Sequence, residues 1–435
     1  MARKMKDSGI EWIGEIPTDF SLYKLKYLLS SPLCYGANES GTLYSDILPR
    51  YIRITDISPN GTLKNSGMLS LDESSAQNYM LHEGDILFAR SGATVGKSFI
   101  YHTYYGRAAY AGYLIKASFN RLVLPEFVYY YTCSSAYEIW KNSIFIQSTI
   151  QNIGADRYSN LPISVPNSID KQLRIVRYLN NFCSKFDAII YNLQTSIEDY
   201  KKLKQAVITQ AVTKGVRGER EMKDSGVAWI GEIPKEWGRA KIKMIASFFN
   251  GDRTSRYPQP SDFVDAGVAF LTSRNIDSDE VDLSETKYIT DDKYKSLSGA
   301  KIQIDDIIFC LRGSVGKCAI NRTLSCGTVA SSLATIRPKD IYPKYLLYFL
   351  LSNIASTQTT IFMNGTCAAN LSAENVGNYY ITLPISAEQK EIANYLDAKC
   401  TEIDKLIAKK EQLIKELESY KKSLIYEVVT GKREV

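Results

Sequence analysis

The stretch FARSGATVGKS, residues 88–98, contains the glycines and the lysine that many phosphate-binding loops use. A loop that wraps a nucleotide phosphate requires the spacing GxxxxGK[ST], which brings several backbone N–H groups onto one anion. Ser91 stands where the first glycine would be required, and the residues after Ser98 are aromatic and β-favouring. The stretch therefore predicts a turn followed by a strand, and it argues against an ATPase.

A second stretch, FCLRGSVGKC at residues 309–318, repeats this pattern. Its glycine spacing is shorter, and Cys318 takes the place of the serine. A nucleotide site would not tolerate these changes, so an arginine, two glycines and a lysine remain as the shared features to be explained.

Other catalytic motifs are missing or occur in one half of the chain only. The only two histidines, His82 and His102, have no histidine at the corresponding positions further along the chain. Asp85 and Asp306 do correspond, but an aspartate between a turn and an apolar strand is typical of a turn-forming residue. A nuclease-like triplet at residues 285–287 has no counterpart, and neither an NPP[FYW] nor a GxGxxG motif is present.

The composition is that of an ordinary globular protein. The 435 residues are 45% hydrophobic and 23% charged, and the length allows two or more domains. No stretch approaches the roughly 18 apolar residues of a membrane span, and no signal peptide is present, so we expect a cytoplasmic protein. The eight cysteines include no CxxC pair, which predicts reduced structural thiols and no metal site. A net charge of +6 permits DNA binding without arguing for it.

An internal repeat organises the chain. MKDSGIEWIGEIP at residues 5–17 returns as MKDSGVAWIGEIP at residues 222–234. Three further pairs follow in the same order in both halves: residues 51–57 and 270–276, the two glycine stretches, and residues 152–156 and 370–374. This order indicates a duplication. We expect Trp12 and Trp229, which lie in the near-identical segments, to pack a domain against a helix.

The most regular part of each half predicts one long helix. Seam positions recur at alternating intervals of four and three residues, which average about 3.5, the period of a coiled coil, and neither run contains Gly or Pro. The first run is Leu179, Cys183, Phe186, Ile190, Leu193, Ile197, Tyr200, Lys204, Val207 and Ala211. The second run is Leu396, Cys400, Ile403, Ile407, Lys410, Ile414, Leu417, Lys421, Leu424 and Val428. Because an amphipathic helix needs a partner for its apolar face, we expect the two helices to pack as an antiparallel coiled coil.

The remaining sequence predicts two globular domains. Short β-rich runs, such as 85–88, 163–165 and 306–309, alternate with turns and with helical stretches near 127–132 and 345–351. The predicted fold class is α+β, with two repeated mixed α/β domains separated by the helices in a pseudo-twofold arrangement and with both termini near the first domain. The predicted boundaries are 1–166 for the first domain, 167–220 for a central helical spacer, 221–384 for the second domain and 385–435 for a C-terminal helical spacer.

Several of these segments resemble a known family. The two SG[IV]xWIGEIP segments, EQKEIANYLD at 388–397 with its weaker copy DKQLRIVRYL at 170–179, and the endings AVTK at 211–214 and VTGK at 429–432 are similar to the specificity subunit of type I restriction-modification systems. The resemblance covers essentially the whole chain. One departure is Lys171, which stands where the family has a glutamate before the glutamine.

The resemblance implies a sequence-specific DNA-binding subunit without catalytic activity. Two target-recognition domains would each read one half of a split site in double-stranded DNA, while the helices set the spacing and dock two modification (methyltransferase) subunits. S-adenosylmethionine, ATP and Mg would belong to these subunits and to the restriction (translocase/endonuclease) subunits, and no membrane is involved. A coiled-coil scaffold that does not bind DNA and a self-sufficient site-specific nuclease remain as alternatives.

The resemblance also suggests which residues contact DNA. We expect the glycine loops to place an arginine and a lysine beside phosphates, since glycine allows close backbone approach, although both loops could be turns kept for folding. The loop candidates are Arg90, Ser91, Gly92, Lys97, Arg312, Gly313 and Lys317. Arg53 and Arg274 are candidates for phosphate or guanine contacts. The polar stretches from Gln147 to Gln151 and from Asn364 to Asn370 are further candidates.

Overall fold

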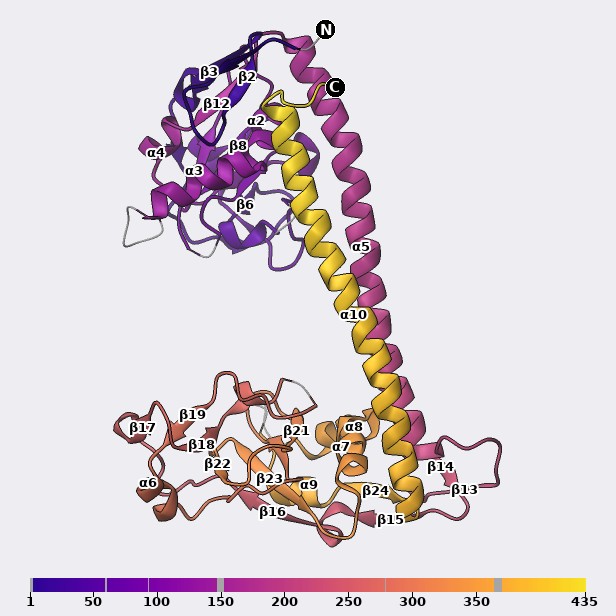
Figure 1. The fold of residues 1–435 in the computed structure, drawn as a ribbon. Coiled ribbons are helices and arrows are strands. Elements are labelled where there is room, and N and C mark those ends of the chain that lie inside the picture. Colours follow the sequence, from indigo (N-terminus) through magenta and orange to yellow (C-terminus); the bar gives the residue numbers. More distant parts are fainter. Residues whose placement is uncertain (1–2, 59–60, 93, 147–151, 278, 364–369) are drawn as a thin grey trace. The chain divides into compact units, whose positions relative to one another are not determined.

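The computed structural model describes residues 3–58, 61–92, 94–146, 152–277, 279–363 and 370–435 (Figure 1). The chain forms two compact units. The first unit comprises residues 1–193 and 412–435, and the second unit comprises residues 194–411. Each unit contains one globular domain and part of both long helices. The two termini both lie in the first unit, as predicted, where the Arg3 side chain donates a hydrogen bond to the carbonyl of Gly431 (2.8 Å).

The two predicted helices are present and are longer than their apolar seams. Helix α5 runs from Ile169 to Lys214 and helix α10 from Ser386 to Val429, 46 and 44 residues. All predicted seam positions are buried or half-buried, whereas most positions between them are exposed. The 3.5-residue period therefore located the packed face correctly.

Two ion pairs link the long helices at equivalent seam positions. Lys421 contacts Asp187 in the first unit (2.6 Å), and Lys204 contacts Asp404 in the second unit (2.8 Å). As residue numbers rise along α5, the numbers of the partners on α10 fall, so the helices are antiparallel. A lysine at a seam position keeps its aliphatic chain against the partner helix while its ammonium group reaches a carboxylate.

The first domain contains two four-stranded sheets among its described residues. One is antiparallel, in the order β4 (Cys34–Tyr35), β11 (Leu114–Ala117), β8 (Ile86–Ala89) and β9 (Ser98–Ile100). The other has the order β10 (Ala108–Tyr110), β6 (Arg50–Ile52), β7 (Leu69–Ser70) and β5 (Thr42–Leu43), with β10 parallel to β6. Two antiparallel pairs accompany them, β1 (Met5–Asp7) with β2 (Glu15–Pro17), and β3 (Phe20–Lys24) with β12 (Pro162–Pro166). The helices are α1 (Glu73–Ala76), α2 (Pro125–Thr132), α3 (Ser135–Ile146) and α4 (Ala155–Ser159), with 3-10 turns at Leu25–Tyr27, Ile54–Asp56, Gln77–Tyr79 and Thr103–Tyr105.

The second domain repeats this topology strand for strand. Its antiparallel sheet has the order β16 (Ala246–Asn250), β23 (Leu333–Pro338), β20 (Ile307–Cys310) and β21 (Cys318–Ile320). Its other sheet has the order β17 (Phe263–Val264), β19 (Lys287–Ile289), β18 (Val268–Leu271) and β22 (Gly327–Val329), with β18 parallel to β22. The two pairs are β13 (Met222–Asp224) with β14 (Glu232–Pro234), and β15 (Gly238–Lys241) with β24 (Tyr380–Leu383). The helices are α6 (Asp291–Ser296), α7 (Pro343–Leu351), α8 (Asn353–Phe362) and α9 (Ala373–Gly377), with 3-10 turns at Ile242–Met244, Pro260–Asp262 and Ser273–Asn275. The predicted duplication and the mixed α/β class are confirmed.

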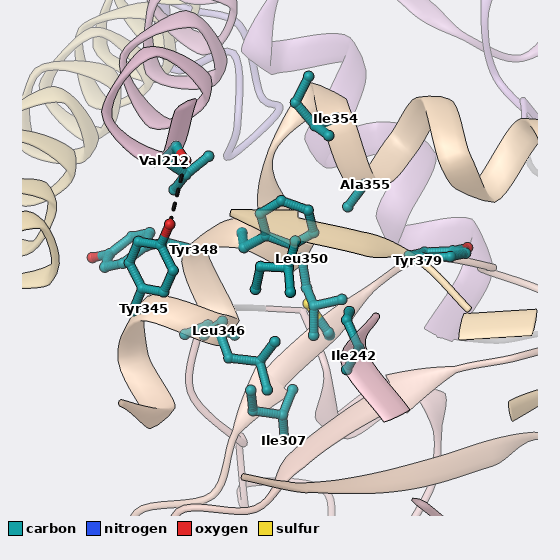
Figure 2. Packing of buried hydrophobic residues seen from close by; sticks show 14 of the residues in the cluster. Val212, Ile242, Ile307, Tyr345, Leu346, Tyr348, Leu350, Ile354, Ala355 and Tyr379 are labelled. Carbon is teal, nitrogen blue, oxygen red and sulfur yellow. Dashed lines mark hydrogen bonds between the residues drawn. The ribbon is translucent and has the colours of Figure 1, made fainter. Parts of the chain in front are cut away.

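In both domains the strand before the glycine loop separates two cores. Along β8, Ile86 and Phe88 face the core built with the helices, whereas Leu87 and Ala89 face the core between the two sheets. Strand β20 alternates in the same way. Figure 2 shows the helix-side core of the second domain, where Ile307 from β20 packs near Leu346 from α7. Because alternate residues point to opposite faces of a strand, one short apolar run serves both cores.

The end of each long helix is hydrogen-bonded to its domain. The carbonyl of Val212 in α5 accepts hydrogen bonds from the hydroxyls of Thr382 (2.6 Å) and Tyr345 (3.3 Å), the latter drawn in Figure 2. In the first unit the carbonyl of Val429 accepts the equivalent bond from Ser164 (3.4 Å). These bonds satisfy carbonyls that the last helical turn leaves free.

A buried glutamine attaches the start of each long helix to its domain. The Gln172 side chain accepts a bond from the Leu124 amide (2.8 Å) and donates to the carbonyls of Leu122 and Pro166 (3.0 Å each). Gln389 in α10 makes the equivalent bonds to the Tyr342 amide (2.8 Å) and the Pro384 carbonyl (2.9 Å). These bonds join the start of each long helix to the residue before α2 or α7, so the glutamine contributes to orienting the helix on its domain.

The position before each glutamine carries opposite charges in the two units. In the second unit Glu388 accepts bonds from Arg220 (2.7 Å) and from the Trp237 indole (3.0 Å). In the first unit Lys171 pairs with Asp19 and lies over the Phe20 ring, 5.2 Å from its centroid. The departure of Lys171 from the family pattern is therefore accommodated by a different set of neighbours.

The repeated tryptophans pack as predicted. Trp12 lies against a core that includes Leu424 and Val428 of α10, and Trp229 lies against one that includes Ile208 and Val212 of α5. Cys183 and Cys400 are buried at seam positions, and burial raises the pKa of both thiols to about 11. Within the described residues, no helix is both long and apolar enough to span a membrane.

Candidate nucleic-acid interface

Four segments that are distant in sequence meet around the glycine loop of the first domain. The Arg90 amide donates to the Tyr113 carbonyl (3.1 Å), and the Arg90 carbonyl accepts from the Ile153 amide (2.8 Å). The Ala155 amide donates to the Tyr35 hydroxyl (3.0 Å). We call residues 35–38, 90–92, 94–97, 111–113 and 152–155 the first loop site. The repeated segment 152–156 is therefore joined to the glycine loop that precedes it in the repeat.

The second domain brings the corresponding segments together. The Leu311 amide donates to the Ser332 carbonyl (2.9 Å), and the Leu311 carbonyl accepts from the Leu371 amide (3.0 Å). The backbones of Ser91 and Asn152 form an antiparallel β-bridge in the first domain, and those of Arg312 and Asn370 form the equivalent bridge in the second. We call residues 250–253, 311–317, 330–332 and 370–373 the second loop site.

The glycines shape both loops as turns. Gly92 and Gly96 have φ values of 77° and 83°, and Gly313 and Gly316 have values of 77° and 90°. These values lie in the left-handed region that favours glycine. Each loop ends in a strand, β9 or β21, as predicted, and it does not open a helix. The nucleotide-binding interpretation is thus excluded by the geometry as well as by the spacing.

The loop arginines are not equivalent in the two domains. The backbone bonds show that Arg90 of the first domain corresponds to Leu311 of the second, which is fully buried. In the same way, Ser91 corresponds to Arg312, which is exposed. The Arg90 guanidinium lies over the Tyr35 ring, 4.9 Å from its centroid, and its Nε is buried without a hydrogen bond among the described residues. The two loop arginines therefore do not occupy equivalent positions, because the shorter glycine spacing of the second loop shifts its arginine by one residue.

The second loop site has an exposed pair of arginines. The Arg312 Nε donates to the Asn370 Oδ1 (3.2 Å), and the Arg253 Nε donates to the Ser331 carbonyl (3.3 Å). The first loop site instead has two tyrosines, Tyr35 and Tyr113, with 42% and 62% of their surface exposed. Arginines can contact phosphates or base edges, while tyrosines offer a flat face and one hydroxyl.

The two loop lysines differ in their partners. Lys317 is paired with Asp277 (2.6 Å), which raises the pKa of the lysine. Lys97 is half-buried, and it forms no ion pair with a residue that the structure describes. Lys97 therefore presents an uncompensated charge, whereas Lys317 must leave a carboxylate before it contacts another anion.

Arg53 and Arg274 also occupy different positions. Arg53 begins the 3-10 turn Ile54–Asp56 and donates to the buried Asp56 (2.9 Å) and to the Gly67 carbonyl (2.7 Å). Its hydrogen-bonding capacity is thus largely used within the domain. Thr272 occupies this position in the second domain, while Arg274 has a side chain that is 78% exposed, with Glu285 3.9 Å away. Only Arg274 is held loosely enough to reach a ligand without breaking a fixed turn.

The repeated aspartates form turns, as predicted. Asp85 accepts a bond from the His82 amide (2.9 Å), and Asp306 accepts one from the Gln303 amide (2.8 Å). Asp306 is further held by two bonds from Arg337, each 2.8 Å. Both carboxylates are buried and serve the structure of their domains.

Some candidates cannot be placed, and some residues of the loop sites were missed. Gln147, Gln151 and Asn364 lie outside the described residues, whereas Asn370 lies in the second loop site. Sequence reasoning did not single out Tyr35, Tyr113 or Arg253. The sequence does contain a signal for these segments, because a glycine, Gly36 or Gly251, precedes the glycine loop in each half. A Cβ at either glycine would collide with backbone carbonyls of residues 110–111 or 329–330, so only glycine lets the two segments approach each other.

The sequence matches a family model in both halves. The model of the type I restriction modification DNA specificity domain matches residues 44–199 and 234–419. The chain belongs to this family. It is therefore a DNA-specificity subunit of a type I restriction-modification system and not a catalytic subunit, and its partners are DNA and the other subunits of such a system. Among the described residues, no group of three or more His, Cys, Asp or Glu side chains could hold a metal ion.

Named relatives agree with this family. The chain is 23% identical over 360 residues to the type I restriction enzyme MjaVIII specificity subunit of Methanocaldococcus jannaschii. The matched residues cover 81% of this chain and 80% of that relative. The chain is 26% identical to the putative type I restriction enzyme MjaX specificity subunit of the same organism, over 97% and 95% of the two chains. Identity to the EcoBI specificity subunit of Escherichia coli is 23%, over 57% of this chain and 53% of that one.

A solved structure shares the fold. It comes from work on complex assembly and conformational transition of the type I R-M system, and it aligns with a TM-score of 0.71 at 15% identity over 96% of this chain and 99% of that chain. At this identity the match shows a common fold. The DNA-contacting residues of this specificity subunit must therefore be inferred from its own loop sites.

Proposed function

We propose that each loop site reads one half of a split DNA sequence and that the two long helices set the distance between the half-sites. The observation that carries this proposal is the contrast between a framework repeated strand for strand and loop sites with different side chains. A duplicated scaffold with two different recognition surfaces is suited to an asymmetric, two-part site. Cytoplasmic residence, where such DNA is accessible, is part of the same proposal.

The charge pattern of the loop sites supports DNA as the ligand. Arg90, Lys97, Arg253 and Arg312 are all without a carboxylate partner among the described residues, whereas Lys317, the remaining cation of the described loop-site residues, is paired with Asp277. A binding surface for phosphates and base edges requires such free cations at glycine-bent loops. The domain boundaries proposed above place one loop site in each domain.

Salt dependence separates this proposal from a protein scaffold. Fluorescence anisotropy of the full chain with labelled random duplexes should show affinity that falls steeply as salt rises, because binding releases counterions from DNA. A chain that binds no duplex at low salt would support the scaffold alternative. Duplex cleavage by the purified chain with Mg would support the nuclease alternative, for which the exposed Glu285 would be the residue to replace.

The ruler function of the helices has its own test. One heptad inserted into both helices, between Leu193 and Ile197 and between Lys410 and Ile414, keeps the seam in phase. The insertion adds about 10 Å, or roughly three base pairs of unread spacer. Methylation-site sequencing with partner subunits should then show the original half-sites with a longer gap. A folded, active variant with the original gap would refute the ruler.

We further infer that the two repeated hairpins, β1–β2 and β13–β14, each dock one methyltransferase subunit. The exposed residues of their strands are the same in both units, with Lys6, Asp7 and Glu15 in the first and Lys223, Asp224 and Glu232 in the second, whereas exposed Glu11 in the turn corresponds to Ala228. Two copies of one partner would favour the same surface twice. Native mass spectrometry should find one methyltransferase subunit fewer bound by Glu15→Lys or Glu232→Lys and two fewer by the double variant. Full binding by the double variant would place the docking surface elsewhere.

A further inference from the structure

The guanidinium of Arg312 is oriented by a neutral side chain. Its Nε donates to the Asn370 Oδ1 (3.2 Å), and the backbones of these two residues form an antiparallel bridge. The Leu371 amide, one residue along, also bonds to the Leu311 carbonyl (3.0 Å). The side-chain bond is thus fixed between two backbone segments, while the terminal nitrogens of Arg312 bond to no residue that the structure describes.

This arrangement suits a planar contact better than a simple charge contact. A phosphate accepts a cation from many directions, and such contacts position a protein without reading sequence. A guanine presents O6 and N7 in one plane, and an arginine reads both when its fork lies in that plane. An amide oxygen at Nε holds the fork without neutralising it, unlike the carboxylate of Asp277 that pairs with Lys317.

We propose that Arg312, positioned by Asn370, reads a guanine in the half-site bound by the second domain. The proposal rests on the DNA-reading function proposed above and adds a base and a residue to it. The contact lies in the major groove, where O6 and N7 of guanine are accessible.

The first domain has the same acceptor without the arginine. Asn152 occupies the position of Asn370, and its Oδ1 is buried and accepts no hydrogen bond among the described residues. Ser91, at the position of Arg312, is too short to supply a forked donor. The first half-site is therefore read differently at this position, and an arginine at residue 91 would complete the missing pair.

The experiment uses the full chain assembled with its methyltransferase subunits, and it compares methylation sites and duplex affinities. Arg312→Lys keeps the charge but removes the fork, so discrimination at one guanine of the second half-site should fall by about ten- to a hundredfold. The other positions should be unchanged. Arg322→Lys, which alters an arginine of the same domain paired with Asp305, is the matched control and should leave every position unchanged. Thermal unfolding checks that both variants fold.

Ser91→Arg provides a gain-of-function arm. It should add a preference for guanine at one position of the first half-site and leave the second half-site unchanged. The proposal is overturned if Arg312→Lys preserves the full recognition sequence, or if a folded Arg312→Gln variant loses affinity equally for all duplexes, since the latter indicates a phosphate contact. Failure of the proposed function looks different, because the wild-type chain itself would then show no salt-dependent DNA binding.

Discussion

The starts of helices α5 and α10 occupy equivalent places in their domains but carry opposite charges. Around α10, Arg220 faces Glu236 and Glu388, with the Trp237 indole donating to Glu388. Around α5, Asp19 faces Arg3 and Lys171, and the ring of Phe20 lies beneath the lysine. The neighbouring charges are the same in both units, with Arg3 and Asp19 corresponding to Arg220 and Glu236. The lysine therefore pairs with the acid and the glutamate with the arginine, and the aromatic ring at the site differs with the ion. Divergence in this framework is therefore compensated.

The loop sites diverge without such compensation. The first domain has Ser91 where the second has Arg312, and the Asn152 Oδ1 beside Ser91 is buried and accepts no hydrogen bond among the described residues. The neighbouring Arg90 Nε is likewise buried and makes no hydrogen bond among them. Unsatisfied buried groups cost stability and persist where function requires them. The framework also contains unbonded buried groups, such as the Arg220 Nε, so the contrast concerns the substituted position itself. The residue that differs at the helix start has a partner in both units, whereas the difference in the loop sites leaves the Asn152 Oδ1 without one among the described residues.

Removing a framework contact should have the largest effect on stability, and a similar one in both halves. Gln172→Ala leaves one amide and two carbonyls without their side-chain partner, and Gln389→Ala leaves at least one of each. Each variant should lower the free energy of unfolding by about 2–4 kcal/mol. Urea denaturation measures this loss. The exposed neighbour Arg174→Ala should stay within about 0.5 kcal/mol of wild type. Equal losses for Gln172→Ala and Arg174→Ala would show that the glutamine is not an anchor.

Compensation itself can be tested at the start of α5. Lys171→Glu leaves two carboxylates with Arg3 as their one cation above Phe20, where the wild type has two cations with one carboxylate, and should cost about 1–2 kcal/mol in the free energy of unfolding. Adding Phe20→Trp supplies an indole donor and recreates the arrangement of the second unit, so the double variant should recover part of the loss. A double-mutant cycle measures the coupling. Strict additivity of the two changes would contradict the account of compensated divergence.

The loop lysines should differ in their contribution to DNA affinity. Lys97→Ala should weaken all duplexes similarly and flatten the salt dependence by about one unit. Lys317→Ala should do less, because Lys317 must first separate from Asp277. Affinities across a salt series measure both slopes, and Asp277→Asn should enlarge the effect of the Lys317 substitution. The reverse ranking of the two lysines would show that the ion pair does not limit Lys317.

The smallest expected effect concerns an ion pair present in the first unit. Lys422 and Lys141 lower the pKa of Glu138 from its usual 4.5 to about 2. Because the folded pKa is the lower one, the stabilisation is present above about pH 4.5 and is lost as the pH falls towards 2. Glu138→Gln should therefore cost less than about 1 kcal/mol at pH 7, since the group is partly exposed, and nothing near pH 2. Urea denaturation at both pH values measures this, and a cost that grows on acidification would reverse the assignment.

Much of the scaffold could be predicted from the sequence, and less of the loop sites. Ten regularly spaced positions per half located the helix seam, because one period governs a whole helix. The glycine loops were found as turns, but the sequence alone did not show that Arg90 corresponds to Leu311 and Ser91 to Arg312. The correspondence between the two loops is decided by backbone bonds to residues 152–153 and 370–371, which lie about 60 residues further along the chain and leave no local pattern in the sequence. Tyr35 and Arg253 were missed because they reach the loop sites through chain crossings at Gly36 and Gly251, far away in sequence.

The central claim is that each domain reads its own half-site on a shared framework. Exchanging residues 18–165 for the matching domain of another specificity subunit, with both helices kept, tests it most directly. Methylation-site sequencing of the assembled complex should show a new first half-site, an unchanged second half-site and an unchanged gap. Changes in both half-sites, or none in either, would contradict the account.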